Sequence, residues 1–339
     1  MSRVMVMMSG GVDSSVAAAM LRDAGHEVTG VTLKLWGGES DSGCCSVSDV
    51  EDARRVAAQL DLPHYVFNFA DAFDENVVAP YVDAYAGGQT PNPCVECNRT
   101  MKFGRVIDRA EQLGFDYVAT GHHARIVDAA DGPALARAAD NAKDQSYVLY
   151  MLGARELART LLPIGDITKA EVRERAHALG LRTASKRESM DVCFITKGGR
   201  ETFLGTRIER RPGRIVDTEG AVVGAHDGID AFTIGQRRGL AVAVGERRYV
   251  VDIAVEDATV TVGTHDDLLR DTVALRDVHV TQPLPSEFLA QTRAHGAATP
   301  AQLHGDQLVF GEPQRRVAPG QVVAFYDGDV CCGGGIAAG

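Results

Sequence analysis

The sequence predicts an α/β protein with a doubly wound parallel sheet, followed by two small β-rich domains, the last of which is a β-barrel. Short apolar runs alternate with helical segments as far as about residue 180, which is typical of βαβ units. Short alternating runs broken by glycine follow from Arg207, and a further β-rich run begins at Leu268. The predicted domains are residues 1–205, 206–266 and 267–339.

The α/β part is predicted from apolar runs, each followed by a segment of helical periodicity. The runs expected to be strands are residues 3–8, 27–36, 64–69 and 116–121. The segments expected to be helices are residues 12–24, 47–60, 73–88, 103–113 and 169–179. The stretch around Cys94 and Cys97 is expected to be a loop. Ligands of such sheets bind beyond the carboxyl ends of the strands, so we expect the site there.

The β-rich part is predicted from apolar alternation between glycines. The runs that show it are residues 213–217, 221–228, 231–240, 247–253, 259–263 and 320–336. Because strands of this length and spacing pair into small sheets or barrels, two compact β domains are the simplest interpretation.

Composition limits the class of protein. The chain is 45% apolar and 24% charged, as in ordinary globular proteins. It has no apolar run of about 18 residues and no secretory leader pattern, so we expect a cytoplasmic protein without a membrane partner. The net charge of −11 argues against non-specific coating of nucleic acid but leaves room for a local basic groove.

Seven cysteines in a chain of this size do not indicate a disulfide framework. Cys94 and Cys97 form a C-x-x-C spacing, which can hold half a zinc site, carry a redox disulfide or present one nucleophilic thiol. No second C-x-x-C or histidine pair lies at zinc-ribbon spacing. The vicinal pairs Cys44–Cys45 and Cys331–Cys332 are interpreted as structural.

The first strand leads directly into the stretch SGGVDSS. Gly10 and Gly11 permit a tight turn, and the helix that follows points its N-terminus at whatever the turn holds. With the serine hydroxyls, this combination predicts an anion-binding loop. Neither the Walker A pattern nor the dinucleotide pattern G-x-G-x-x-G occurs in the chain. The alternative is an ordinary glycine turn in which Asp13 favours the start of the helix.

This loop resembles the PP-loop of the ATP pyrophosphatase superfamily, whose members adenylate a substrate and release pyrophosphate. Further motifs narrow the resemblance: TPNPCVECN, ATGHHARI, KDQSYVLYML, SMDVCFI, IGQRRGL and CCGGGI occur in this order. Together they resemble the tRNA-specific 2-thiouridylase family along essentially the whole chain. The resemblance implies an ATP-dependent 2-thiolation of the wobble uridine of tRNA, with ATP and Mg²⁺ as cofactors.

The chemistry of that reaction agrees with the cysteines. Adenylation turns the C2 oxygen into a leaving group, and a persulfide then supplies sulfur, which requires two thiols within reach of each other. The family's pattern places the nucleophile at Cys97 and the persulfide at Cys193. Cys94 departs from the pattern, because many relatives carry an acidic residue there. The alternative is that Cys94, Cys97 and Cys193 bind an iron–sulfur cluster.

The resemblance also implies binding residues. Those expected to bind ATP are Met7, Met8, Ser9, Gly10, Gly11, Val12, Asp13, Ser14, Leu33 and Gly121, with Asp13 also catalytic. Those expected to face the target base are Asn92, Pro93 and Cys94. Those expected to contact tRNA are His122, Lys143, Asp144, Gln145, Arg293, Ala294 and Gln321. Arg293, Ala294 and His295 stand where relatives carry Arg-Tyr-Arg, which puts the contact beyond Arg293 in doubt.

The expected partners are tRNA and a persulfide donor, either a cysteine desulfurase or a sulfur-relay protein. Basic clusters that could meet RNA are the group Arg207, Arg210, Arg211 and Arg214, and the pairs Arg237–Arg238, Arg247–Arg248 and Arg315–Arg316. Two rival functions are another PP-loop enzyme that adenylates a small molecule, and a redox- or metal-sensing RNA-binding protein.

Overall fold

The computed structural model describes residues 1–35, 47–186, 192–195, 199–240, 242 and 247–338. Its first part is built on one parallel sheet in the order β3-β2-β1-β4-β7. The strands are β1 (Arg3–Met7), β2 (Glu27–Lys34), β3 (His64–Asn68), β4 (Tyr117–Ala119) and β7 (Thr160–Leu161). The predicted vicinal pair Cys44–Cys45 lies outside the described residues.

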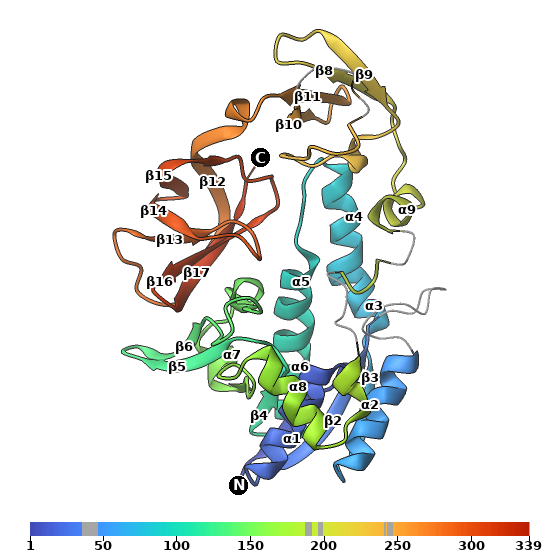
Figure 1. The fold of residues 1–339 in the computed structure, drawn as a ribbon, viewed down its shortest axis with the longest axis vertical. Coiled ribbons are helices and arrows are strands. Elements are labelled where there is room, and N and C mark those ends of the chain that lie inside the picture. The colour runs from blue at the N-terminus through green and yellow to red at the C-terminus, as the bar shows by residue number, and fades with distance from the viewer. Residues whose placement is uncertain (36–46, 187–191, 196–198, 241, 243–246, 339) are drawn as a thin grey trace.

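Helices cover both faces of this sheet, as the doubly wound prediction requires (Figure 1). Alternate side chains of β1 enter opposite cores, because successive residues of a strand point to opposite faces. Val4 and Val6 pack with α1 (Val12–Asp23), α2 (Val47–Gln59) and α8 (Lys169–Ala178). Met5 and Met7 pack on the other side. The partners there are α3 (Ala70–Phe73), η1 (Asp74–Val78), α4 (Ala79–Ala86), η2 (Cys97–Arg105) and α6 (Val106–Gln112).

The expected loop around the cysteines is wrong, because Cys94 and Cys97 lie at the start of a helix. Helix α5 (Pro93–Glu96) continues without a break into η2 and α6. Asn92 caps the helix, since its Oδ1 accepts from the amide of Cys94 at 3.1 Å. Pro93 occupies the first position of the helix, where its missing N–H costs nothing. The asparagine and proline that suggested a loop are therefore start signals of the helix.

The central part is a four-stranded sheet in the order β10-β11-β8-β9. Its strands are β8 (Gly213–Val216), β9 (Val222–His226), β10 (Tyr249–Ala254) and β11 (Thr259–Gly263). The run 231–240 is not a strand: after the short helix η5 (Ile229–Ala231) it forms turns and irregular structure. Its apolar members Phe232, Ile234 and Leu240 are nonetheless buried in the core of this part.

The C-terminal part is a closed antiparallel barrel, as predicted, because β12 pairs with both β15 and β17. Its strands are β12 (Leu269–Val280), β13 (Phe288–Gln291), β14 (Thr299–His304), β15 (Gln307–Arg315), β16 (Val322–Asp327) and β17 (Val330–Ala337). A hairpin that the sequence did not reveal, β5 (Arg125–Ala129) and β6 (Gly132–Ala136), extends this sheet through a pairing of β6 with β17. The barrel therefore shares a sheet with the N-terminal part, and the predicted domain boundaries stay a prediction.

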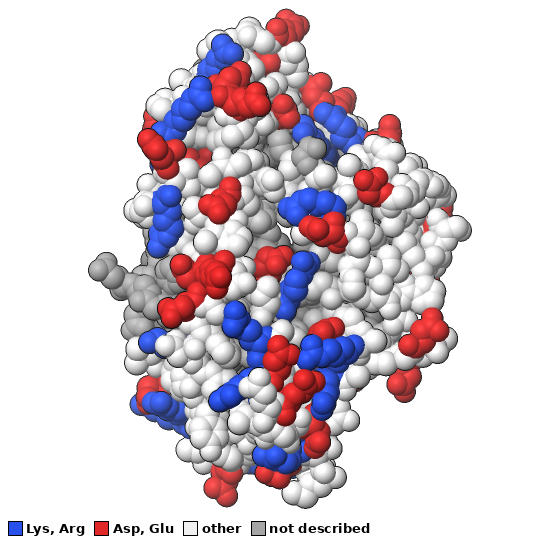
Figure 2. Space-filling view, turned by 180° about the vertical axis from the view of Figure 1, so that it is seen from behind, with Lys and Arg blue, Asp and Glu red and all other residues white. Residues whose placement is uncertain are grey.

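The remaining helical segments are short. They are η3 (Ser146–Leu149), α7 (Ala154–Ala158), η4 (Arg182–Ser185), α9 (Gly199–Gly205) and η6 (Asp266–Leu268). No helix within the described ranges has both the length and the apolar character needed to cross a membrane. Basic and acidic side chains are interspersed over the face that Figure 2 shows.

Candidate functional site

A cavity of about 730 Å³ lies at the carboxyl ends of the parallel strands. Its wall combines four segments that are far apart in sequence: the loop after β1, the start of the helix at Pro93, the segment after β4, and two turns of the barrel. Of the residues predicted to bind ATP, base or tRNA, all line this cavity except Gly10. Cys97 and Cys193 line it as well.

The phosphate loop is shaped by its glycines. Gly10 has a φ of +71°, and a Cβ at this position would collide with the backbone of Asp49. Gly11 is the N-cap of α1 and brings no side chain, so the start of the helix stays open to a ligand. The hydroxyl of Ser14 accepts from the amide of Ser9 at 3.2 Å and closes the loop. Gly10 thus forms the loop without lining the cavity.

The end of β4 packs directly on this loop. A Cβ at Gly121 would lie 2.5 Å from the amide nitrogen of Ser14 and 2.7 Å from the carbonyl carbon of Asp13. Only glycine leaves room for that approach. The predicted role of Gly121 in nucleotide binding is therefore consistent with a backbone that sits against the phosphate loop.

The carboxylate of Asp13 contacts two side chains, Lys169 and His123. The ammonium of Lys169 donates to both of its carboxylate oxygens, at 2.6 and 2.7 Å, and the Nε2 of His123 lies 3.3 Å from Oδ1. Burial works against the charged carboxylate, but these contacts outweigh burial and lower the pKa of Asp13. The surroundings of Asp13 thus fit an ammonium partner better than a Mg²⁺ ion, which prefers oxygen ligands and water.

Lys169 is a site residue that sequence reasoning missed. It is the first residue of α8 and is only 8% exposed. Thr168 caps this helix in a capping box with Glu171, which fixes the direction in which Lys169 enters the cavity. The sequence does place Lys169 at the start of a predicted helix, which is a common position for a ligand-binding residue. Nothing in the sequence, however, links Lys169 to Asp13.

Lys186 is the second cation that sequence reasoning missed. Its ammonium donates to the carbonyl of Gly10 at 2.9 Å and to the carboxylates of Asp49 and Asp52, each at 2.7 Å. Burial opposes the charge, but the two carboxylates outweigh it and raise the pKa of Lys186. Lys186 therefore clamps the turn of the phosphate loop to α2.

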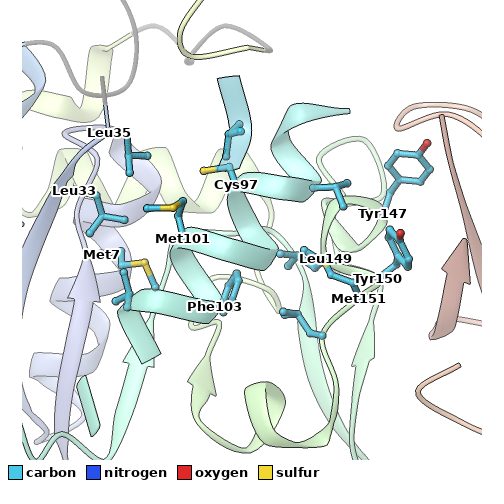
Figure 3. Close-up of a cluster of buried hydrophobic side chains, with 14 of the residues drawn as sticks. Met7, Leu33, Leu35, Cys97, Met101, Phe103, Tyr147, Leu149, Tyr150 and Met151 are labelled. Atoms are coloured by element: carbon cyan, nitrogen blue, oxygen red, sulfur yellow. The ribbon is translucent and has the colours of Figure 1, made fainter. Parts of the chain in front are cut away.

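The two cysteines of the C-x-x-C differ in environment. Cys97 is 6% exposed and extends, like Met101, toward the side chains of Met7 and Leu33 on the parallel sheet (Figure 3). Cys94 is half-buried one turn earlier on the helix. Cys193 is also half-buried and packs against the same apolar core as Cys97.

The three cysteines do not fit an iron–sulfur cluster in this arrangement. Within the described residues, no three of the His, Cys, Asp and Glu side chains lie where they could hold one metal ion. Cluster ligation by Cys94, Cys97 and Cys193 would require their side chains to move.

Several residues predicted to contact tRNA are fixed by hydrogen bonds within the protein. His122 bonds to the hydroxyl of Thr120 at 2.7 Å, and burial, followed by the charge of Lys102, lowers its pKa far below the ordinary value. Gln145 accepts from the amide of His123 at 2.9 Å. Arg293 and Ala294 form a turn whose carbonyls accept from the side chain of Gln291.

Asp144 is satisfied entirely within the chain. Its carboxylate accepts from the amides of Ala138 and Ser146, the hydroxyl of Ser146, and Arg137, all within 3.1 Å. The guanidinium of Arg137 lies 3.7 Å above the ring of Tyr326 in the barrel. This carboxylate therefore fixes the loop that carries Lys143 and Gln145.

The arginines of the basic cluster predicted at Arg207, Arg210, Arg211 and Arg214 are exposed, but each also contacts another residue of the protein. Arg210 pairs with Asp230, which is 2% exposed, at 2.8 Å, and Arg211 donates to the carbonyl of Glu256. Arg207 lies over the ring of Phe203 at 4.0 Å. Arg210 and Arg211 thus link segments that are distant in sequence.

Family comparisons agree with this three-part architecture. Residues 2–197 match a model described as "tRNA methyl transferase HUP domain", residues 201–264 a "tRNA methyl transferase PRC-barrel domain" and residues 270–337 an "Aminomethyltransferase beta-barrel domain". Three curated relatives named tRNA-specific 2-thiouridylase MnmA align over nearly their full length. Those of Roseiflexus sp. (strain RS-1) and Chloroflexus aggregans are each 48% identical to this chain, and both alignments cover 99% of it. The alignments cover 99% of the Roseiflexus protein and 98% of the Chloroflexus protein. That of Moorella thermoacetica is 46% identical and covers 98% of both.

The chain belongs to the tRNA-specific 2-thiouridylase family. The fold expected from that family, a parallel α/β sheet followed by a barrel, is the fold observed. Among solved structures, a 4-thiouridine synthetase–RNA complex with bound ATP aligns weakly, with 18% identity and a TM-score of 0.38 over 57% of this chain and 44% of that one.

Proposed function

We propose that this chain is an ATP-dependent tRNA uridine 2-sulfurtransferase that acts on the wobble uridine. One observation carries the proposal: the phosphate loop and two cysteines from distant segments, Cys97 and Cys193, line the same cavity. A phosphate loop alone would fit any adenylating enzyme, and paired thiols alone would fit a redox protein. Their combination in a 2-thiouridylase family member fits adenylation followed by sulfur transfer.

The adenylation half of the reaction uses the loop and its cations. ATP would place its phosphates at the start of α1, against the amides that follow Gly11. The C2 oxygen of the uridine attacks the α-phosphorus, and pyrophosphate leaves. Lys169 lies where it can offset the charge that develops on the leaving pyrophosphate, and Asp13 holds its ammonium in place. Mg²⁺ would enter with the nucleotide and supply further positive charge on its phosphates.

The sulfur half of the reaction uses the two thiols. The terminal sulfur of a persulfide on Cys193 attacks C2, and AMP departs with the former carbonyl oxygen. The thiolate of Cys97 then attacks the Sγ of Cys193, which leaves the sulfur on C2 and forms a disulfide between the two cysteines. An external thiol must reduce that disulfide before the next turnover. The sulfur comes from a persulfide donor, either a cysteine desulfurase or a sulfur-relay protein.

Cys94 is not required by this scheme. Its half-buried position one turn before Cys97 places it beside the target-base segment with Asn92 and Pro93. We assign it to the wall of the base pocket. The enzyme would work in the cytoplasm, where thiols stay reduced.

A second candidate function is methyl transfer to tRNA, because two of the three matching family models are described as domains of a tRNA methyl transferase. Methyl transfer requires neither a phosphate loop at the start of a helix nor two thiols in one cavity. The small-molecule rival is also disfavoured, because the cavity reaches Arg293 and Gln321 of the barrel, which a substrate confined to the phosphate loop would not need.

The test is mass spectrometry of tRNA after incubation with the protein, Mg-ATP and a persulfide donor. We expect a mass gain equal to the replacement of oxygen by sulfur at the wobble uridine, with one pyrophosphate released per sulfur. A methyl mass, or pyrophosphate release that does not need tRNA, would refute the proposal.

A further inference from the structure

A second hollow of about 480 Å³ lies beside the 730 Å³ cavity that holds Cys97 and Cys193, which we call the cysteine cavity. Three arginines from distant segments line it: Arg200 of α9, Arg293 after β13, and Arg316 directly after β15. None of the described residues that line this hollow is acidic. In a protein of net charge −11, this gathering of guanidinium groups creates a local positive field. We refer to it as the arginine hollow.

Two of these arginines are fixed by contacts with residues that do not line the hollow. Arg316 donates from Nη1 to the carbonyl of Val251 and to the carboxylate of Asp252, both at 2.8 Å. Arg200 donates to the hydroxyl of Tyr85 at 3.2 Å, and its guanidinium lies 5.2 Å from the centre of that ring. Such anchoring holds the planar guanidinium groups in place before a ligand arrives.

Two residues that line the arginine hollow each carry a buried polar atom without a partner in the described part of the chain. These atoms are the Nε of Arg200 and the hydroxyl oxygen of Thr233. A buried donor without a partner is costly, and such atoms in natural proteins are usually satisfied by a ligand or ordered water. An N–H of a guanidinium together with a hydroxyl group matches the oxygens of a phosphate.

The arginine hollow borders the cysteine cavity. Thr90, Arg293 and Gln321 line both. A ligand that fills the cavity and carries a phosphate beside its base can therefore reach both sites at once. An extruded nucleotide of an RNA loop has this form, because its backbone remains outside the base pocket.

We propose that the arginine hollow binds the phosphodiester next to the target uridine, with Arg200 and Thr233 as contacts in addition to Arg293. The inference rests on the proposed function, because it takes tRNA to be the substrate. Phosphate contacts position an RNA and bases specify it, so these residues would set how deeply the uridine enters the cavity.

The experiment measures binding of a tRNA anticodon stem-loop by fluorescence anisotropy, using the full chain. Three RNAs are compared: one with natural phosphates, and two with a neutral methylphosphonate on the 5′ or the 3′ side of the target uridine. Each is titrated with wild type, Arg200→Gln and Thr233→Val. Thr233→Val preserves side-chain volume, so it reports on the hollow even if Arg200→Gln is poorly folded.

We expect Arg200→Gln to weaken binding of the natural RNA about tenfold and to reduce the slope of log K against log salt by about 0.7. One methylphosphonate RNA should bind wild type about tenfold more weakly. That RNA should lose nothing further with Arg200→Gln or Thr233→Val, because the phosphate charge they recognise is already absent. The matched control is Arg155→Gln, whose side chain pairs with Asp108 and Glu111 outside the hollow. It should leave affinity and slope unchanged.

The inference would be overturned if, for both methylphosphonate RNAs, the loss of affinity caused by the variant added to the loss caused by the methylphosphonate. A second result would also overturn it: Arg200→Gln or Thr233→Val binds all three RNAs as wild type does, but its thiouridine formation is less inhibited by free pyrophosphate. The hollow would then be a site for the pyrophosphate product. Thiouridine formation by wild type is measured in parallel. Its absence refutes the proposed function, whereas additive losses alongside normal wild-type thiolation refute only the phosphodiester subsite.

Discussion

Lys169 and Asp13 form a charge pair at the start of α1, and this pair changes the role expected for Asp13. An aspartate beside a phosphate loop suggests a metal ligand. In the structure both of its oxygens accept from the ammonium of Lys169, so Asp13 acts by positioning a cation. The side chain of Lys169 is only 11% exposed, so its pairing with Asp13 is largely shielded from water.

We therefore predict that Asp13→Asn and Lys169→Met both reduce tRNA-dependent pyrophosphate release, by about 100-fold or more. Either change removes the positioned charge beside the leaving phosphates. Pyrophosphate is measured by a coupled assay, and thermal unfolding checks that each variant is folded. Arg22→Gln, at the opposite end of α1, is the control and should release pyrophosphate normally. A folded Asp13→Asn protein with wild-type release would remove Asp13 from the adenylation step.

The burial of His122 makes the free energy of unfolding of the protein depend on pH. Its pKa lies far below the ordinary value because it is buried, and the nearby Lys102 and His123 add to the effect, while Asp13 opposes it. Between the folded pKa and about 6.5, the unfolded chain binds a proton at His122 that the folded chain does not. The free energy of unfolding should therefore fall as the pH drops below about 6.5.

Urea unfolding at several pH values between about 5 and 7 measures this slope. His122→Asn should reduce it, by at most about 1.4 kcal/mol per pH unit. An unchanged slope in the folded variant would mean that His122 titrates alike in both states.

At the scale of elements, the site depends on where β4 ends and α1 begins. Gly121 touches the backbone of Asp13 and Ser14, so a methyl group there must push the phosphate loop away. We predict that Gly121→Ala weakens ATP binding about tenfold or more and destabilises the fold by about 1–3 kcal/mol. Calorimetry with ATP measures the first effect.

Gly311→Ala is the matched control for this prediction. A Cβ at Gly311 would meet Pro300 at 3.5 Å, which is ordinary van der Waals contact. Equal ATP affinity in the Gly121→Ala and Gly311→Ala proteins would show that the close packing of β4 on the loop does not matter for the nucleotide.

The helix that begins at Pro93 shows what the sequence could and could not predict. Strands β1, β2, β3 and β4 and helix α1 followed from their apolar periodicity, and the phosphate loop followed from the two glycines between β1 and α1. The cysteine segment was misassigned because Asn92 and Pro93 are both turn formers and helix-start residues, and local sequence does not separate the two uses. The hairpin β5–β6 escaped prediction because its partner β17 lies almost 200 residues away.

At the scale of the molecule, the barrel forms part of the cavity wall and is joined to the catalytic part by buried polar contacts. Ser146 lies 3.0 Å from the hydroxyl of Tyr326, and Tyr147 donates to the carbonyl of Val322 at 2.7 Å. Family resemblance named most of the residues of the cavity. The pairing of Lys169 with Asp13 and the arginine hollow depend on tertiary contacts that no local pattern reveals.

Tyr326→Phe should lower the free energy of unfolding by about 1 kcal/mol, because it removes one buried hydrogen bond while Ser146 keeps its bond to Asp144. It should also weaken tRNA binding, since the loop carrying Lys143 rests on this junction. Urea unfolding and anisotropy measure the two effects. Unchanged stability would show that the Tyr326 hydroxyl does not help join the barrel to the catalytic part.

The central claim is that one cavity adenylates a uridine and then delivers sulfur from Cys193 to it with the help of Cys97. The most direct measurement is the ratio of 2-thiouridine formed to pyrophosphate released, under anaerobic conditions with tRNA, Mg-ATP and a persulfide donor. We predict a ratio near one for wild type and for Cys94→Ser. We predict pyrophosphate without 2-thiouridine for Cys193→Ser and Cys97→Ser. Wild-type thiouridine yields from Cys193→Ser, or loss of thiolation together with bound iron in Cys94→Ser, would contradict this account.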